Sequence, residues 1–153
     1  MRTVDTRWVA APAERLFRCA AAVEDWPRIL PHYRWVRMRE RRGTGGLVEM
    51  AAWRPFGPLR WPTWWLSEME VDAARREVRY RHVGGVTTGM SVLWSVVEDG
   101  SGSRATILHE WSGPPWALLR RPAAEWVIGP VFVHGIASRT LAGIARAAEA
   151  SDG

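Results

Sequence analysis

The chain has 153 residues, of which 47% are hydrophobic and 24% are charged, and its formal net charge is +5 at pH 7. This balance excludes a disordered chain and is typical of a folded protein, so residues 1–153 are expected to form a single domain. The longest uncharged stretch near the middle, Val83–Val97, is too short and too polar to cross a bilayer. Cys19 is the only cysteine, so no disulfide can form within the chain and a cytoplasmic location is expected.

The N-terminal part of the chain predicts one strand followed by two short helices. Thr3–Ala10 alternates in the way that strand residues do. Pro12 stands in the first turn of a predicted helix that continues to Val23, where proline is well tolerated. Asp25 then opens a second short helix that ends near Pro31.

The middle of the chain predicts six strands joined by tight turns. Alternating runs of polar and apolar residues are separated by glycine-rich or proline-rich segments, and Pro55–Pro62 is predicted to be one of the loops. Strands that follow one another so closely form an antiparallel sheet. The predicted strands are Tyr33–Arg41, Leu47–Arg54, Trp64–Val71, Glu77–Val83, Thr87–Val97 and Arg104–Trp111.

The C-terminal part predicts a proline-containing loop, Ser112–Pro122, and then a long helix. Gly129 and Pro130 break the start of this helix, which should be continuous over Val131–Ala150. The predicted fold class is therefore α+β, with a curved seven-stranded antiparallel sheet wrapped on the long C-terminal helix and two short helices after the first strand. Such a sheet leaves a hollow between itself and the helix.

Several short motifs carry a family resemblance. Their order and spacing resemble the helix-grip fold of the START/Bet v1-like (SRPBCC) superfamily and, within it, the polyketide cyclase/dehydrase group with its bacterial aromatase/cyclases. The resemblance implies a solvent-shielded pocket in which a poly-β-ketone chain is folded, closed by an aldol reaction and dehydrated, with no cofactor. The motifs are Trp26-Pro27 followed by Tyr33, Trp65-Leu66-Ser67-Glu68, Met90-Ser91-Val92-Leu93-Trp94 and Ser138-Arg139-Thr140.

The resemblance also implies two arginines and one tyrosine in the pocket. Tyr33 stands in the place of the tyrosine. Met69 occupies the place of the first arginine, two residues after Ser67, and His82 falls at the place of the second. The chain thus keeps one of these three side chains and departs from the family at the other two.

His82 and Tyr33 are the candidate catalytic residues. Strand alternation places His82 on the inward face, and a histidine with an unshifted pKa suits proton transfer near neutral pH. Tyr33 is a candidate donor to a substrate carbonyl. The alternative for each is a structural side chain that bonds to the backbone.

Candidate substrate-binding residues come from the tryptophan-rich composition and the same motifs. Tryptophan supplies 11 of the 16 aromatic residues, and a small core cannot easily bury so many indoles, so some are expected to line a cavity. A plain aromatic core is the alternative. The candidates are Trp26, Trp65, Ser67, Met69, Met90, Trp94 and His134.

A metal site is not expected. His109 shares the inward phase of its strand, so a site made of His82, His109 and His134 is conceivable. No pair of these histidines has close ligand spacing, and no carboxylate clearly joins them.

The charge pattern indicates candidate partners. Arg28–Arg42 holds six arginines and one acidic residue, and a stripe of Arg37, Arg39 and Arg41 would attract an acidic partner or is simply a solvated face. A small hydrophobic ligand is the expected partner, and an acidic acyl carrier protein is a further candidate. Membrane contact without a spanning segment stays open, and nucleic acid is not expected. The oligomeric state is not predicted.

The expected function is a polyketide cyclase/dehydratase that binds a hydrophobic ligand in an internal cavity. The alternative is a non-catalytic carrier of a lipid or quinone, of the coenzyme Q-binding type, and the absence of the family arginine at Met69 favours it.

Overall fold

The computed structural model describes residues 1–56, 58–113 and 133–150, and its element order matches the prediction. The predicted loop beyond Gly113 and the predicted break at Gly129 and Pro130 lie outside the described residues. Most strand boundaries fall within two residues of their predicted positions, which is the usual accuracy for such ends. The elements are β1 (Arg2–Val9), α1 (Ala13–Ala21), the short 3₁₀ helix η1 (Val23–Asp25), α2 (Trp26–Ile29), β2 (Tyr33–Arg42), β3 (Gly45–Phe56), β4 (Leu59–Asp72), β5 (Glu77–Gly85), β6 (Ser91–Asp99), β7 (Gly102–Glu110) and α4 (His134–Ala150).

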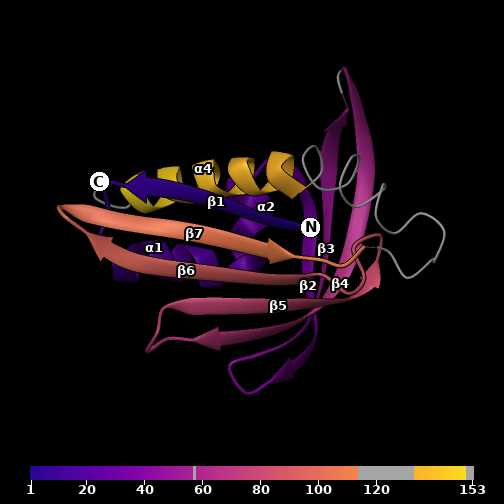
Figure 1. Ribbon diagram of the computed structural model, residues 1–153, viewed down its shortest axis with the longest axis horizontal. Helices are drawn as coiled ribbons and strands as arrows, with labels where there is room; N and C mark the ends of the chain where they lie inside the picture. The colour runs from indigo at the N-terminus through magenta and orange to yellow at the C-terminus, as the bar shows by residue number, and fades with distance from the viewer. Residues whose placement is uncertain (57, 114–132, 151–153) are drawn as a thin grey trace.

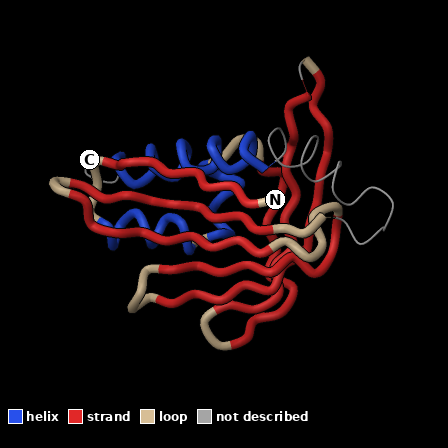
Figure 2. The backbone as a smooth tube through the Cα atoms, viewed as in Figure 1, coloured by secondary structure: helices blue, strands red, loops and turns tan. Residues whose placement is uncertain are grey.

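The strands form one antiparallel sheet in the order β1-β7-β6-β5-β4-β3-β2, which confirms the predicted α+β fold class. The sheet curves, and α1, α2 and α4 lie on its concave side (Figures 1 and 2). Within the described residues, no helix is both long and apolar enough to cross a membrane.

The concave face of the sheet carries the core. Successive side chains of a strand point to opposite faces, so alternate residues of β3 to β7 point toward the helices. Glu68 and Arg81 lie on the other face and are exposed. The buried residues of the concave face include Val48, Met50, Trp65, Val78, Tyr80, Trp94 and Ile107.

A glycine lets α2 and α4 approach each other closely. A Cβ atom added to Gly143 would lie 2.1 Å from Leu30 Cδ2, and the Leu30 side chain is completely buried. Because the glycine has no side chain, Leu30 fills the space beside α4. This contact fixes α4 over the start of β2.

The predicted loop Pro55–Pro62 is wrong over most of its length. β3 continues to Phe56 and β4 begins at Leu59, so the two strands form a long two-stranded arm that projects from the sheet (Figure 1). β4 pairs with β5 only from Trp65 onward, so Pro62 lies on a free edge where its missing N–H breaks no ladder.

The predicted start of the sixth strand is also wrong, because β6 begins at Ser91 rather than at Thr87. Gly85, the last residue of β5, and Gly89 have φ values of 92° and 89°, in the left-handed region that favours glycine and ends a regular strand. The chain therefore turns back on β5, where Gly89 N–H donates to the His82 carbonyl oxygen at 2.9 Å. This turn brings the Thr87 side chain beside His82.

Candidate functional site

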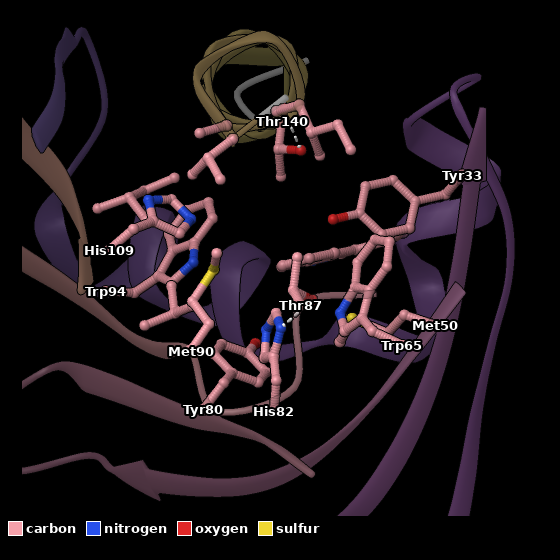
Figure 3. A pocket seen from close by; sticks show the side chains of 16 residues that line it. Tyr33, Met50, Trp65, Tyr80, His82, Thr87, Met90, Trp94, His109 and Thr140 are labelled. Atoms are coloured by element: carbon pink, nitrogen blue, oxygen red, sulfur yellow. Dashed lines mark hydrogen bonds between the residues drawn. The ribbon is translucent and has the colours of Figure 1, made fainter. Parts of the chain in front are cut away.

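A cavity lies between the concave face of the sheet and α4, as Figure 3 shows in a view along the helix. Its volume is about 70 Å³, and its wall is mostly aromatic and aliphatic. The described residues that line it come from nearly every element of the fold. They are Trp26, Tyr33, Met50, Trp65, Tyr80, His82, Thr87, Met90, Val92, Trp94, Ile107, His109, Val133, Ile136, Ala137 and Thr140.

Six of the nine predicted site residues lie together in this wall. They are His82 and Tyr33, predicted to be catalytic, and Trp26, Trp65, Met90 and Trp94, predicted to bind substrate. Strand alternation, the start of α2 and the turn before β6, which holds Met90, direct all six at the same space.

The other three predicted residues, Ser67, Met69 and His134, do not line the cavity, which corrects their expected position. Ser67 is completely buried between neighbouring strands, and its hydroxyl has no hydrogen-bond partner within the described part of the chain. Met69 faces Tyr80 across the β4–β5 pair. His134 lies at the first turn of α4, where its Nδ1 contacts the buried Asp5 carboxylate.

His82 is held against two neighbours. Its Nδ1 is hydrogen-bonded to Thr87 Oγ1 at 2.6 Å, and its ring stacks on Trp65 with an interplanar angle of 18°. Burial, with a smaller contribution from nearby His109, lowers the pKa of His82 to about 3. The expectation of a pKa near neutrality is therefore wrong, because the apolar wall disfavours the imidazolium. The imidazole is neutral at every physiological pH.

The wall contains two polar side chains, His109 and Tyr80, each with a polar atom that lacks a hydrogen bond. Tyr80 Oη and His109 Nδ1 are both buried, and neither has a hydrogen-bond partner among the described residues. Burial lowers the pKa of His109 to about 4 and raises the pKa of Tyr80 well above its usual value. The wall thus contains a neutral imidazole and a neutral phenol that are free to bond to a guest.

Tyr33 closes the opposite side of the cavity, and its phenol oxygen points into the space (Figure 3). Its ring packs edge-on against Trp26 and Trp65 at centroid distances of 5.2 Å and 6.1 Å. Burial raises the pKa of Tyr33, against a smaller opposing effect of a hydrogen bond with Thr140, so the phenol keeps its proton.

A second hydrogen-bonded pair lies behind Tyr33. Thr140 Oγ1 donates to the Ile136 carbonyl oxygen at 2.8 Å and lies 3.0 Å from His32 Nε2. Because the threonine proton is already used, His32 Nε2–H is the donor to Thr140 Oγ1. Burial and the nearby charge of Arg139 lower the pKa of His32 to about 4, which agrees with this neutral tautomer.

Sequence reasoning left most of the remaining wall out of the predicted site. Tyr80 and His109 had a usable signal, because both share the inward phase of their strands. Met50 has the same phase in β3, but nothing in its neighbourhood distinguishes it from core. Thr87 had no signal, since it depends on the turn before β6, and His32 depends on a partner that is 108 positions away.

The wall carries no formal charge. None of the described residues that line it is Arg, Asp or Glu, and the two histidines in it are neutral. Among the described residues no three His, Cys, Asp or Glu side chains come together as metal ligands, and His134 is turned away from His82 and His109. The geometry suits a neutral, largely apolar guest that carries hydrogen-bonding oxygens.

Comparisons with known proteins agree with this geometry. Residues 9–132 match the family described as polyketide cyclase/dehydrase and lipid transport. The actinorhodin polyketide synthase bifunctional cyclase/dehydratase of Streptomyces coelicolor is 29% identical over 119 residues, which make up 77% of this chain. Those residues make up 37% of that relative, so the chain matches little more than a third of its length.

Solved structures share the fold. The Zhui aromatase/cyclase of Streptomyces sp. R1128 superposes with a TM-score of 0.83 at 20% identity, covering 100% of this chain and 96% of that one. A START superfamily protein of Mycobacterium smegmatis superposes with a TM-score of 0.67 at 18% identity, covering 98% and 95% of the two chains. The expected helix-grip fold of the START/Bet v1-like superfamily is confirmed.

Proposed function

The chain belongs to the polyketide cyclase/dehydrase and lipid transport family, and from this premise we propose that it binds a poly-β-ketone in its cavity and promotes aldol cyclisation and dehydration. An acyl carrier protein is the proposed donor of the ketone chain.

One observation carries the proposal: polar atoms without partners in an otherwise apolar wall. A buried phenol or imidazole without a hydrogen bond costs about 1–3 kcal/mol, and a guest with carbonyl oxygens removes this cost. Tyr80 Oη and His109 Nδ1 are such atoms, and Tyr33 lies across the space from them (Figure 3). A poly-β-ketone carries a carbonyl on every second carbon and therefore matches a wall with several separate donors.

The proposed chemistry needs one base and donors to the enolate. The Nε2 atom of neutral His82 removes a proton from a methylene between two carbonyls, and Tyr33 or Tyr80 donates a hydrogen bond to the enolate oxygen. The carbanion attacks a distant carbonyl carbon, a carbon–carbon bond forms, and the new alkoxide takes the proton from His82. Loss of a second proton and of the hydroxyl group then releases water.

The environment of His82 disfavours the imidazolium, so a proton stays on the ring only briefly. With a pKa of about 3, the ring is always neutral and available, it is a weak base that relies on the donors to the enolate oxygen, and it readily gives the proton on to the alkoxide. The bond between Nδ1 and Thr87 Oγ1 holds the ring in place, and Trp65 covers its face. Thr87 is thus proposed as a positioning residue.

A poly-β-ketone requires the cavity to widen. Ligand sites commonly enclose about 300–1,000 Å³, whereas the present space is about 70 Å³. Met50 and Met90 line it, and methionine side chains change rotamer easily. We therefore propose that the guest enters by displacing flexible side chains of the wall.

A His82→Ala variant tests the catalytic assignment. The protein is combined with a ketosynthase pair and a carrier protein that make the ketone chain, and the products are separated by mass spectrometry. We expect the cyclised, dehydrated product to be lost in His82→Ala, while tryptophan quenching by a hydroxyanthraquinone stays within about twofold of wild type, because the aromatic wall is intact. Unchanged turnover in His82→Ala would show that His82 is not the base.

A non-catalytic carrier of a quinone or other neutral lipid is the second candidate function. The uncharged wall favours it, as does Met69 in the place of the family arginine, since a carrier needs no charged group at its guest. Mass spectrometry of the gently purified protein separates the two functions. A bound prenyl quinone supports the carrier, and a bound polyketide supports the enzyme.

A further inference from the structure

A second hollow lies on the outside of the molecule, between α4 and the β3–β4 arm. It has a volume of about 510 Å³ and is called the arginine groove here. α4 contributes Arg139, Ala142 and Arg146, whose spacing places them on one helix face. The other residues that line it are Leu30, Pro31, His32, Trp53, Pro58, Leu59 and Arg60.

No described residue neutralises the charge of this groove. Arg60, Arg139 and Arg146 are exposed, no acidic residue of the described chain lines the groove, and none of the three arginines forms an ion pair within the described residues. Three guanidinium groups around one hollow create a strong positive potential, which attracts an anion.

The arginine stripe expected from the sequence differs in this respect. Arg39 pairs with Glu49 and Arg41 pairs with Glu24, each at 2.5 Å. Their charge is therefore largely compensated within the chain. Arg37, the third member of the stripe, lies over the Trp35 ring instead. The stripe is thus a largely paired face, whereas the three arginines of the groove have no acidic partner among the described residues.

The groove and the cavity share a wall that is one pair of side chains thick. His32 lines the groove and Thr140 lines the cavity, and these two side chains are hydrogen-bonded at 3.0 Å. A molecule held in the groove therefore lies next to the cavity, behind Tyr33.

We propose that the arginine groove binds the phosphate of a phosphopantetheine arm that carries the ketone chain. This rests on the proposed function, because it assigns the groove to the thioester-bound form of the same substrate. Arginine suits the phosphate, since its planar guanidinium donates two parallel hydrogen bonds to phosphate oxygens. The uncharged part of the arm is matched by Trp53, Leu59 and Pro31, which form the apolar wall of the groove.

Calorimetric titration with free 4′-phosphopantetheine tests the assignment on the folded full chain. We expect measurable binding to wild type and a loss of about tenfold or more in the Arg139→Glu/Arg146→Glu variant, because removing a guanidinium–phosphate pair costs more than a neutral hydrogen bond. Arg81→Glu is the control, because it makes the same kind of substitution away from the groove. Arg81 is exposed on β5 and lines no part of the groove. Its affinity should match that of wild type.

Two further probes identify the anion. Pantetheine, which lacks the phosphate, should bind at least about tenfold more weakly than phosphopantetheine. Inorganic phosphate should also bind more weakly, because it cannot contact the apolar wall. Equal affinity for phosphopantetheine and inorganic phosphate would overturn the proposal of an arm, and equal affinity of wild type and the double variant would overturn the groove itself.

A third comparison shows whether the arm is attached to a carrier protein or belongs to a free thioester. It compares the affinities for the holo form of an acyl carrier protein, for its apo form and for coenzyme A. Binding of the holo form above the apo form supports a protein-borne arm, whereas coenzyme A binding alone supports a free thioester. The hydroxyanthraquinone titration runs in parallel. If the double variant keeps its affinity for phosphopantetheine while wild type still binds the anthraquinone and turns over, the groove proposal fails and the proposed function stands.

Discussion

The two imidazoles that face the cavity make the stability of the fold depend on pH. Burial lowers the pKa of His82 to about 3 and that of His109 to about 4, whereas in the unfolded chain both titrate near the usual value for histidine. Below that value the unfolded chain binds protons that the folded chain does not, so the free energy of unfolding falls as the pH falls. At pH 5 each histidine should lower it by about 2 kcal/mol relative to pH 7.5. Urea unfolding at several pH values measures this change.

The His82→Gln/His109→Gln variant is the control for this prediction. Glutamine keeps hydrogen-bonding atoms but does not titrate, so the slope of stability against pH between pH 7.5 and 5 should become shallower. Part of the slope remains, because burial also lowers the pKa of His32 to about 4. An equally steep slope in the variant would assign the acid sensitivity to other groups.

The Tyr80→Phe variant tests whether the Tyr80 hydroxyl stabilises the fold or contributes to the affinity for the ligand. Tyr80 Oη is buried without a partner, so its removal should leave the free energy of unfolding of the empty protein unchanged or raise it by about 1 kcal/mol. The same change removes a donor to the ligand, so the affinity for a hydroxyanthraquinone should fall about three- to tenfold. Thermal unfolding and fluorescence titration give the two values. A clear loss of stability would mean that the hydroxyl serves the fold.

For single residues, the sequence predicts the direction of a side chain wherever the alternation along one strand decides it. His82, Trp65 and Trp94 are correctly placed in the cavity wall, because alternation along one strand decides their direction. His134 has the right helical phase, but it lies at the end of α4 and meets the Asp5 carboxylate, which comes from the far end of the chain. Contacts of that kind are not encoded in local periodicity.

At the scale of elements, the packing of α2 against α4 depends on the absence of a side chain at Gly143. Gly143→Ala would place a Cβ atom 2.1 Å from Leu30 Cδ2, and Leu30 is completely buried and cannot move away freely. Overpacking costs about 1–3 kcal/mol, and alanine returns about 0.5–1 kcal/mol through helix propensity, so the free energy of unfolding should fall by about 1 kcal/mol.

Gly135→Ala in the same helix is the matched control. A Cβ atom added there meets nothing within 4 Å, so the substitution should be neutral or slightly stabilising. Chemical denaturation of both variants checks the pair. A Gly143→Ala protein as stable as Gly135→Ala would show that Leu30 repacks without cost.

The element order and the sheet could be predicted because hairpin-linked alternating runs allow few arrangements. The two errors have local physical causes. Proline normally ends a strand, but Pro62 lies on the free edge of the β3–β4 arm, and Thr87 is strand-like in composition, but the glycines around it have positive φ. Both strand boundaries depend on how far a neighbouring strand extends, and this cannot be predicted from the sequence of one strand alone.

At the scale of the whole molecule, the curved sheet and α4 enclose a space that the core does not fill. Three of the eleven tryptophans, Trp26, Trp65 and Trp94, line it, which confirms that some indoles lie at a cavity rather than in solid core. The uncharged wall contains buried polar atoms without partners, so it gains most from an apolar guest that carries oxygen atoms. Both proposed functions therefore require the same space to be occupied.

Filling this space tests that requirement most directly. Ala137 lines the cavity from α4, so Ala137→Trp places an indole in it, and Ala137→Leu is a smaller change should the larger one unfold the protein. Ala142→Trp puts the same side chain on α4 outside the cavity and serves as the control. In a fluorescence titration with a hydroxyanthraquinone, we expect both Ala137 variants to weaken binding, by about tenfold or more for tryptophan, and Ala142→Trp to bind as wild type does. Wild-type affinity in a folded Ala137→Trp protein would contradict a ligand site between the sheet and α4.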